Sequence, residues 1–262
     1  MGVFMTRTIF AIALLGATSL AGASQASTIA ALVGDNTIAM VDTASLKVTG
    51  TMKTSGASGR ILGIDVRPAD GMLYAVTADG VAWTIDAKSG KATQKSKFDM
   101  APPTGMVTVD FNPVADRLRV MGSDGMNLRI NVDDGKVTKD GDLKYAESDM
   151  HKGEKPNVVA GAYTNSVKGA KETTLYNIDA TIGALVRQAP PNDGVLNVIG
   201  KLGMTPKSVA FDIAAGEAAG TGWLMADGTL YRVDLATGKA TMAGKVSGVS
   251  GPVRDIAIMP AM

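Results

Sequence analysis

The sequence of residues 61–98 is ILGIDVRPADGMLYAVTADGVAWTIDAKSGKATQKSKF, and it contains four short strand-like runs separated by three tight connections. Pro68 ends the first run, because proline has no N–H to donate to a β-ladder. The pair Asp79-Gly80 lies between two apolar runs and predicts a hairpin turn, since both residues tolerate a positive φ. The last run is rich in lysine, which is typical of an exposed edge strand. Residues 61–98 therefore predict a four-stranded antiparallel sheet.

The same order of runs and turns recurs along the chain, in residues 106–143, 157–203 and 208–246. Equivalent positions in the first run of successive copies are 45, 52, 50 and 43 residues apart, and they are Asp65, Asp110, Ala162, Asp212 and Asp255. A period of this length with four strands per copy predicts a β-propeller, in which each copy forms one blade.

Residues 29–56 supply only three runs of a copy, and the innermost run is missing. The run VRDIAIMP at residues 253–260 has the missing pattern. We therefore predict an all-β propeller of five four-stranded blades, with the N- and C-terminal strands sharing one blade and the C-terminal strand innermost. A six-bladed ring with a hidden copy near residues 186–203 is one alternative, and an open β-sandwich or a two-domain all-β fold is another.

Residues 1–26 have the features of an export signal. Arg7 is followed by the apolar run IFAIALLGA, and Ser24-Gln25-Ala26 resembles a cleavage site with small residues at both ends. The apolar run is too short for a transmembrane helix, which needs about 20 residues. We expect residues 27–262 to form a single propeller domain in the periplasm or outside the cell. The chain has no cysteine, so neither disulfides nor a lipidated cysteine contribute.

The overall charge does not indicate a nucleic-acid partner. The chain has 26 Lys and Arg residues against 25 Asp and Glu residues, a net charge of +1, and Arg7 lies in the expected signal. The charges are interspersed and form no long basic run. We expect no nucleic acid, no membrane insertion after signal cleavage, and a monomer that binds a protein or a small ligand whose identity the sequence leaves unknown.

The repeated aspartates are the first candidates for chemistry. They occur at the same place in the innermost strand of four blades, so their side chains are expected to lie near the central axis. A ring of carboxylates could bind a hard cation such as calcium, and the candidate metal ligands are Asp65, Asp110, Asp212 and Asp255. Alternatively, each buried carboxylate could accept backbone N–H groups and tie neighbouring blades together. The fifth position is Ala162, which favours this structural role.

Other acidic residues and the single histidine point less clearly to a site. The hairpin aspartates Asp79, Asp124 and Asp227 are explained by turn chemistry. His151 has Glu147, Asp149 and Glu154 around it, but zinc usually takes three or four nitrogen or sulfur ligands, and no second His or Cys exists. A catalytic triad would also need His151, and no nucleophile elbow is recognisable. We identify no catalytic residue and no cofactor-binding residue.

Three irregular stretches stand out from the repeats, at residues 99–105, 144–156 and 187–194. In a propeller, such connections are expected to emerge on one face of the disc. Loops carried by a rigid scaffold are frequent binding sites. These stretches are therefore candidates for contact with a partner.

Several of these motifs together resemble one bacterial family, the domain of unknown function 4394. The motifs are GIDVRPADGMLYAVTADG, VDFNPVADRLRVMGSDG, VVAGAYTNS with TTLYNID, and LYRVDLATGKAT. The resemblance covers about residues 30–260 and implies an exported, propeller-like protein. It implies no catalytic residues, because the family has no established activity.

The leading hypothesis is a non-enzymatic, exported binding or interaction module, although catalytic activity remains an open question. One alternative is a hydrolase or lyase that uses carboxylates, with or without a metal, in the axial channel. Another is a structural protein whose ring is stabilised by calcium, the one cofactor that the sequence suggests.

Overall fold

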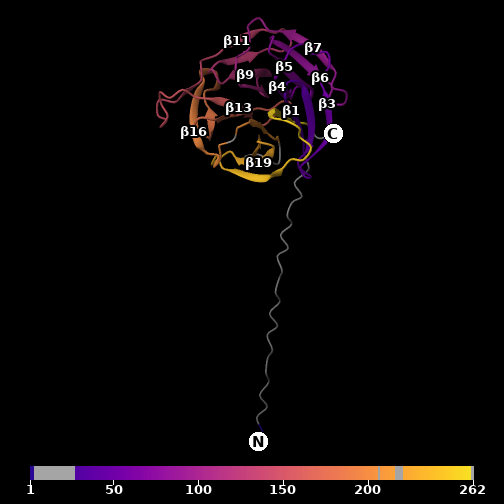
Figure 1. The fold of residues 1–262 in the computed structure, drawn as a ribbon. Helices are drawn as coiled ribbons and strands as arrows, with labels where there is room; N and C mark the ends of the chain where they lie inside the picture. Colours follow the sequence, from indigo (N-terminus) through magenta and orange to yellow (C-terminus); the bar gives the residue numbers. More distant parts are fainter. Residues whose placement is uncertain (3–26, 206, 216–220, 261–262) are drawn as a thin grey trace.

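The strands form five sheets arranged as blades around a central axis (Figure 1). The computed structural model describes residues 1–2, 27–205, 207–215 and 221–260. Residues 3–26, where the sequence predicts most of the export signal, lie outside the described residues. Within the described ranges, no helix has the length and apolar character needed to cross a membrane.

The blades are numbered here from the N-terminus, and their strands are given from the axis outward. Blade 1 contains β21 (Val253–Ile258), β1 (Thr28–Val33), β2 (Thr37–Asp42) and β3 (Lys47–Lys53). Blade 2 contains β4 (Ile61–Val66), β5 (Leu73–Thr77), β6 (Val81–Ile85) and β7 (Ala92–Lys97). Blade 3 contains β8 (Val107–Asn112), β9 (Arg117–Gly122), β10 (Asn127–Ile130) and β11 (Val137–Lys139).

Blades 4 and 5 complete the ring. Blade 4 contains β13 (Val158–Tyr163), β14 (Leu175–Asp179), β15 (Ala184–Gln188), β16 (Val195–Lys201) and β12 (Lys144–Tyr145). Blade 5 contains β17 (Val209–Ile213), β18 (Thr221–Ala226), β19 (Thr229–Asp234) and β20 (Ala240–Lys245). A short 3₁₀ helix, Pro191–Asp193, lies between β15 and β16. Blade 4 differs from the predicted four strands, because β12 adds a fifth strand in parallel to β16.

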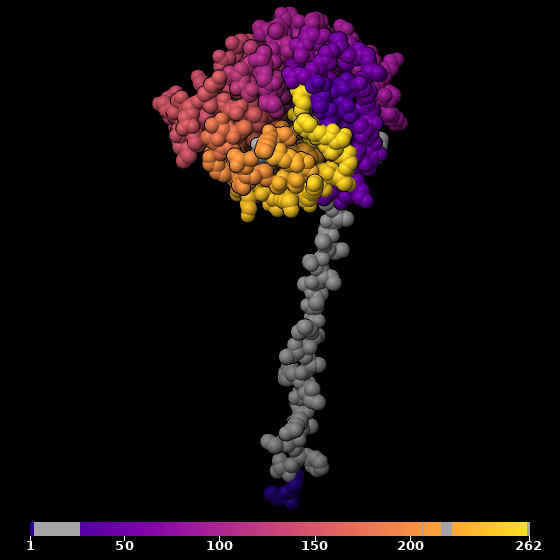
Figure 2. All heavy atoms as spheres, in the orientation of Figure 1, coloured from indigo at the N-terminus to yellow at the C-terminus, as the bar shows by residue number. Residues whose placement is uncertain are grey.

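The two ends of the described chain meet in blade 1. Strand β21 pairs in antiparallel fashion with β1, with Ile29 opposite Ile258 and Leu32 opposite Asp255. The C-terminal segment accordingly lies beside the first strands in both views (Figures 1 and 2). This confirms the prediction of five blades with one blade shared by the termini. The six-bladed alternative is wrong, because residues 186–203 include β16 and the end of β15, which belong to blade 4.

The five innermost strands form a closed ring, in the order β21, β4, β8, β13 and β17. These strands are almost entirely buried, whereas the outermost strands β3, β7 and β20 are largely exposed. Apolar side chains fill the space between neighbouring blades, and the ring of Tyr74 in blade 2 meets the ring of Phe111 in blade 3 edge to face at 5.2 Å. The core therefore lies between blades rather than inside any one of them.

The hairpin turns contain the predicted Asp-Gly pairs, although in blades 2 and 3 only the glycines, Gly80 and Gly125, have a positive φ. In blade 5, Asp227 and Gly228 have φ values of 49° and 76°, the left-handed conformation that a two-residue hairpin turn requires at both positions. The connection between the third and fourth strands is capped by the side chain of Asp86 in blade 2, which accepts N–H bonds from Lys88 and Ser89. Local sequence thus determines how each blade folds back on itself.

Gly63 marks the closest approach of three innermost strands. A Cβ atom at this position would lie 2.6 Å from Asp255 Oδ2 in blade 1 and 2.6 Å from Val109 Cγ2 in blade 3. The missing side chain lets the neighbouring blades reach β4 from both sides. This close approach is possible only for glycine.

We expect Gly63→Ala to lower the free energy of unfolding by about 1–3 kcal/mol, because overpacking forces both neighbours to shift. The matched control is Gly50→Ala in the outer strand β3, where an added Cβ has no neighbour within 4 Å. That change should be neutral or slightly stabilising, since alanine loses less backbone entropy on folding. Urea unfolding of both variants measures the difference, and equal effects would contradict the role of Gly63.

Candidate functional site

The repeated aspartates lie near the axis, as their sequence positions predict. Each is carried by an innermost strand, and the exposed fractions of the four residues are only 3–6%. They are Asp255 on β21, Asp65 on β4, Asp110 on β8 and Asp212 on β17. The fifth innermost strand, β13, carries Ala162 at this position, so blade 4 contributes no carboxylate.

Each of these carboxylates accepts a backbone N–H from the next blade of the ring. The four bonds are Ile64 N to Asp255 Oδ2 at 2.9 Å, Phe111 N to Asp65 Oδ2 at 2.7 Å, Tyr163 N to Asp110 Oδ1 at 2.9 Å, and Ile258 N to Asp212 Oδ2 at 2.6 Å. They join blade 1 to 2, 2 to 3, 3 to 4 and 5 to 1. Among the described residues, no such carboxylate joins blade 4 to blade 5, and apolar residues pack this junction as they do the others.

The second oxygen of three carboxylates accepts the N–H of the following residue in its own strand. These bonds are Val66 N to Asp65 Oδ1, Ile213 N to Asp212 Oδ1 and Ile256 N to Asp255 Oδ1, at 2.6–3.0 Å. Each carboxylate thereby holds one residue of its own blade and one of the next. The structural role that the sequence left open is therefore present at all four aspartates.

The electrostatic environment of the four carboxyl groups favours their protonated forms. Burial raises the pKa values of Asp65, Asp110 and Asp255 well above their ordinary value, and charge repulsion from neighbouring carboxylates adds to the effect. Burial also raises the pKa of Asp212, to about 6, against the opposing effect of its two backbone hydrogen bonds. The cluster therefore carries less negative charge than four exposed aspartates would.

Three of the four carboxylates come close enough together to share a cation. One oxygen each from Asp65, Asp110 and Asp212 lies within 4.8 Å of the others, while Asp255 is outside this group. Calcium binds oxygen ligands at about 2.3–2.6 Å, so ligand oxygens of one ion lie within about 5 Å of each other. The oxygen spacing and the carboxylate chemistry fit such an ion. Calcium at this position stays a prediction.

The hairpin aspartates have a second role that the sequence analysis missed. Besides shaping their turns, they hold the connection that enters their own blade. Asp79 accepts a bond from Ser58 Oγ at 2.8 Å, Asp124 from Thr104 N at 3.2 Å, and Asp227 from the N–H groups of Lys207 and Ser208 at 3.0–3.2 Å. These connections are thus fixed against the disc by a repeated carboxylate.

The loop with the single histidine is ordered by its own acids. His151 Nδ1 lies 3.0 Å from Glu154 Oε2, and its ring is 5.4 Å from that of Tyr145. Asp149 accepts the N–H of His151 and, through its other oxygen, the N–H of Val198. Asp149 thus binds backbone groups with both oxygens. Within the described residues, this loop forms no group of three metal-ligating side chains.

Two buried arginines between blades were not anticipated, because alternation along a strand does not distinguish an inward arginine from an exposed one. Arg67 makes paired hydrogen bonds to Asp116 and to Asp133, across the junction of blades 2 and 3. Arg119 is 1% exposed, bonds at 2.6 Å to Asp140 at the end of its own blade, and bonds at 2.8 Å to Asn192 across the junction of blades 3 and 4. Both arginines tie blades together.

The stretch at residues 187–194 therefore differs from the expectation of a free binding loop. Its Asn192 is bound by Arg119, and it connects the third strand of blade 4 to the fourth. Residues 99–105 and 146–156 lead into innermost strands instead. The connection into blade 4 nevertheless runs beside this stretch, since Lys144 N donates to the carbonyl of Gly194 at 2.9 Å. That all three stretches share one face stays a prediction.

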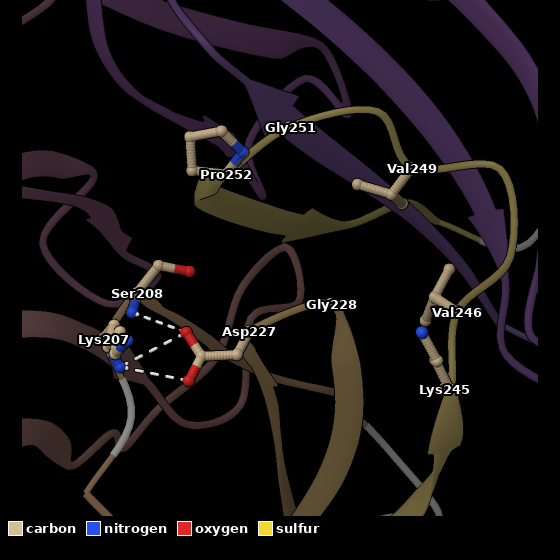
Figure 3. Close-up of a pocket in the computed structure, with 9 residues that line it drawn as sticks. All are labelled: Lys207, Ser208, Asp227, Gly228, Lys245, Val246, Val249, Gly251 and Pro252. Atoms are coloured by element: carbon tan, nitrogen blue, oxygen red, sulfur yellow. Dashed lines mark hydrogen bonds between the residues drawn. The ribbon is translucent and has the colours of Figure 1, made fainter.

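An open pocket lies where blade 5 meets blade 1. Its volume is about 510 Å³, and Figure 3 shows its lining residues. We call it the junction pocket, and its lining residues are Lys207, Ser208, Asp227, Gly228, Lys245, Val246, Val249, Gly251 and Pro252. They come from the connections that enter β17 and β21, from the β18–β19 hairpin and from the end of β20. No local sequence pattern pointed to this pocket, because separate segments of the chain form it.

A second, smaller pocket of about 380 Å³ lies between the outer strands of blade 5 and residues 43–46 of blade 1. Its floor includes Trp223, over whose ring the guanidinium of Arg232 stacks at 4.8 Å. The side chain of Met242 at its edge is 67% exposed. Both pockets therefore flank the junction that closes the ring.

Comparison with known proteins identifies a family and a shared fold. The family model described as "Domain of unknown function (DUF4394)" matches residues 37–257. No curated protein matches the chain. A protein of unknown function from Bacteroides thetaiotaomicron VPI-5482 is 16% identical, with a TM-score of 0.52, over 92% of this chain and 68% of that chain. This likeness shows the fold alone.

A further solved structure, a protein of unknown function from Bacteroides caccae, is 14% identical to this chain. The match covers 90% of this chain and 100% of that chain, with a TM-score of 0.46.

The raised pKa values predict how stability depends on pH in the presence of a chelator. An acid whose pKa is higher in the folded state binds more protons when folded, so the free energy of unfolding falls as pH rises. For Asp212 the fall spans the range from the ordinary value of 3.8 to the folded value of about 6. This group alone should contribute about 3 kcal/mol to the change.

Urea unfolding between about pH 4 and 7 tests this expectation. The decrease should be smaller in Asp212→Asn, which cannot titrate, and it should persist in Asp134→Asn, a change at an exposed turn. An unchanged decrease in Asp212→Asn would show that the axial cluster is not the group that titrates.

Proposed function

This chain belongs to the DUF4394 family, whose description assigns no activity, and we propose that it is an exported, non-enzymatic binding module that takes a small ligand in the junction pocket. The observation that carries the proposal is the size and position of this pocket. Ligand pockets typically have volumes of about 300–1,000 Å³, and the junction pocket has about 510 Å³. It opens among connections carried by a rigid ring, where binding sites are common.

The state of the axial carboxylates supports binding rather than catalysis. A hydrolase in the axial channel would need at least two of them to touch a substrate. Each is at least 94% buried and already accepts a backbone N–H from a neighbouring blade. Using one of them as an acid or base would break a tie between blades. The single histidine is on a loop outside this cluster.

Export to the periplasm or to the medium rests on the sequence of residues 1–26. A monomer without nucleic-acid partners agrees with the interspersed charge and the closed ring of blades. N-terminal sequencing of the protein from the cell envelope or the medium should begin near Ser27. A chain that keeps Met1 and stays in the cytoplasm would contradict export.

Filling the junction pocket tests the binding role. We expect a panel of hexanoate, hexyl phosphate, hexanol and hexylammonium to include at least one compound that binds with a millimolar Kd or better, measured by saturation-transfer NMR. Val249→Trp and Ser208→Tyr fill the space from two different walls (Figure 3). Each should weaken that binding at least about tenfold, because the ligand and the new ring occupy the same volume.

The matched control for these variants is Met242→Trp, which places the same ring at the smaller pocket beside the same junction. It should leave binding unchanged. Thermal unfolding checks that all three variants are folded, and two pocket-filling variants guard against the loss of one. Binding that survives in both variants, or a panel with no bound member, would count against the junction pocket as the ligand site.

A second candidate role is a ring stabilised by calcium at the axial carboxylates. The specific observation in its favour is the group of three carboxylate oxygens within 4.8 Å. A cation there would replace protons as the partner of the buried negative charge. Asp65, Asp110 and Asp212 would hold it, and this role would not exclude a ligand in the junction pocket.

Thermal unfolding with calcium, with zinc and with a chelator tests the calcium role. An ion at a hundred times its Kd adds about 2.7 kcal/mol, which should raise the midpoint by roughly 5–10 °C. Asp110→Asn keeps an acceptor for Tyr163 N but removes one charge, so it should abolish most of the shift. If neither ion changes the midpoint of the wild-type chain, the four aspartates serve as ties only.

A further inference from the structure

Equivalent lysines end the outermost strands of four blades, and one of them lines the junction pocket. In four blades, the last residue of the outermost strand is a lysine that lies opposite the first residue of the third strand, and these lysines are Lys53, Lys97, Lys201 and Lys245. In blades 2 and 4 the ammonium group is used within its own blade. Lys97 Nζ donates to the carbonyl of Asp79, and Lys201 Nζ donates to that of Ile182 at 2.7 Å.

Lys245 in blade 5, like Lys53 in blade 1, makes no such bond. Among the described residues, the ammonium group of Lys245 takes part in no hydrogen bond or ion pair, and it lies at the wall of the junction pocket. Lys207 lines the same pocket, and its side chain likewise has no partner among the residues that the structure describes. Two exposed cations thus belong to one pocket, and neither is neutralised by a carboxylate of the described chain.

Among the described lining residues, Asp227 is the only acid, and its carboxylate is directed at the backbone of the adjacent connection. It accepts the N–H groups of Lys207 and Ser208 (Figure 3). The described lining residues, with two lysines and one aspartate, therefore have a net charge of +1, and the acid is held by the backbone of one wall. This arrangement favours a ligand with a negative group.

The remaining lining is suited to an apolar body. Val246, Val249 and Pro252 supply aliphatic surface, and the hydroxyl of Ser208 supplies one polar group. Figure 3 shows Lys207 and Ser208 on one side of the space and Lys245 with Val246 on the other. An inorganic anion would fill only a small part of about 510 Å³, so the apolar wall would stay in contact with water.

We infer that the junction pocket binds a small organic anion, with its carboxylate or phosphate group between Lys207 and Lys245 and a short aliphatic body against Val246, Val249 and Pro252. This inference rests on the proposed binding function and adds the chemical class of the ligand. Lysine ammonium groups act as point charges that accept either anion. Burial of each CH₂ group of the aliphatic body contributes through the hydrophobic effect.

Isothermal titration with four probes of equal chain length tests the inference. We expect hexanoate, hexyl phosphate or both to bind, and hexanol and hexylammonium to bind at least tenfold more weakly. Comparison of hexanoate with hexyl phosphate identifies which anionic group is preferred. Inorganic phosphate alone should bind more weakly than hexyl phosphate, because it lacks the body that contacts the valines.

Two lysine variants and one matched control connect the charge preference to this pocket. Lys207→Gln and Lys245→Gln should each weaken anion binding about threefold to tenfold and reduce its dependence on salt. Lys53→Gln changes the equivalent lysine of blade 1, which does not line the pocket. It should leave anion affinity unchanged, and thermal unfolding checks that all three variants are folded.

The outcomes separate this inference from the function on which it rests. If hexanol or hexylammonium binds as tightly as the anions and Val249→Trp weakens that binding, the pocket binds ligands but the anionic class is wrong. If the anions bind but lose the same affinity in Lys53→Gln as in Lys245→Gln, the charge effect is not local and the inference fails. If no probe binds, both the inference and the binding role fail.

Discussion

The hydrogen bond from a backbone N–H of one blade to a buried carboxylate of its neighbour is the contact on which the ring depends. The blades are separate sheets, so no continuous ladder runs across their innermost strands. An axial carboxylate bridges this gap because it reaches one acceptor oxygen into the next blade. The absence of a side chain at Gly63 leaves room for the carboxylate of Asp255 in the neighbouring blade. Backbone spacing and side-chain chemistry therefore have to agree at these four junctions.

The same bonds place four acids in an environment that opposes their charge. Backbone N–H groups stabilise the carboxylates, whereas burial and mutual repulsion favour the protonated forms. We consequently expect the axial cluster to respond to protons or to cations. The axial acids hold the blades together, and the ligand site that we propose lies instead at a place where the repeat is irregular.

The closing junction between blades 5 and 1 is such a place. Repetition assigns the same residue types to equivalent positions, and their usual roles are internal. Hairpin aspartates hold connections, and terminal lysines of blades 2 and 4 bond to their own hairpins. At this junction the chain joins its first and last segments, and Lys245, like Lys53 of blade 1, has no side-chain partner among the described residues. Lys245 and Lys207 line an open pocket there.

The sequence by itself determined the fold of each blade and the order of the blades. Asp-Gly turns, Pro68, lysine-rich outer strands and the missing first run before Ile29 are local signals, because turn geometry and strand alternation depend on neighbouring residues. It also placed Asp65, Asp110, Asp212 and Asp255 near the axis. Only the tertiary structure decided that Asp255 lies outside the group of three, that Arg119 holds Asn192, and that Lys207 and Lys245 line one pocket. These facts depend on how separate blades pack against each other. That packing brings together residues that are too far apart in the sequence for a local pattern to relate them.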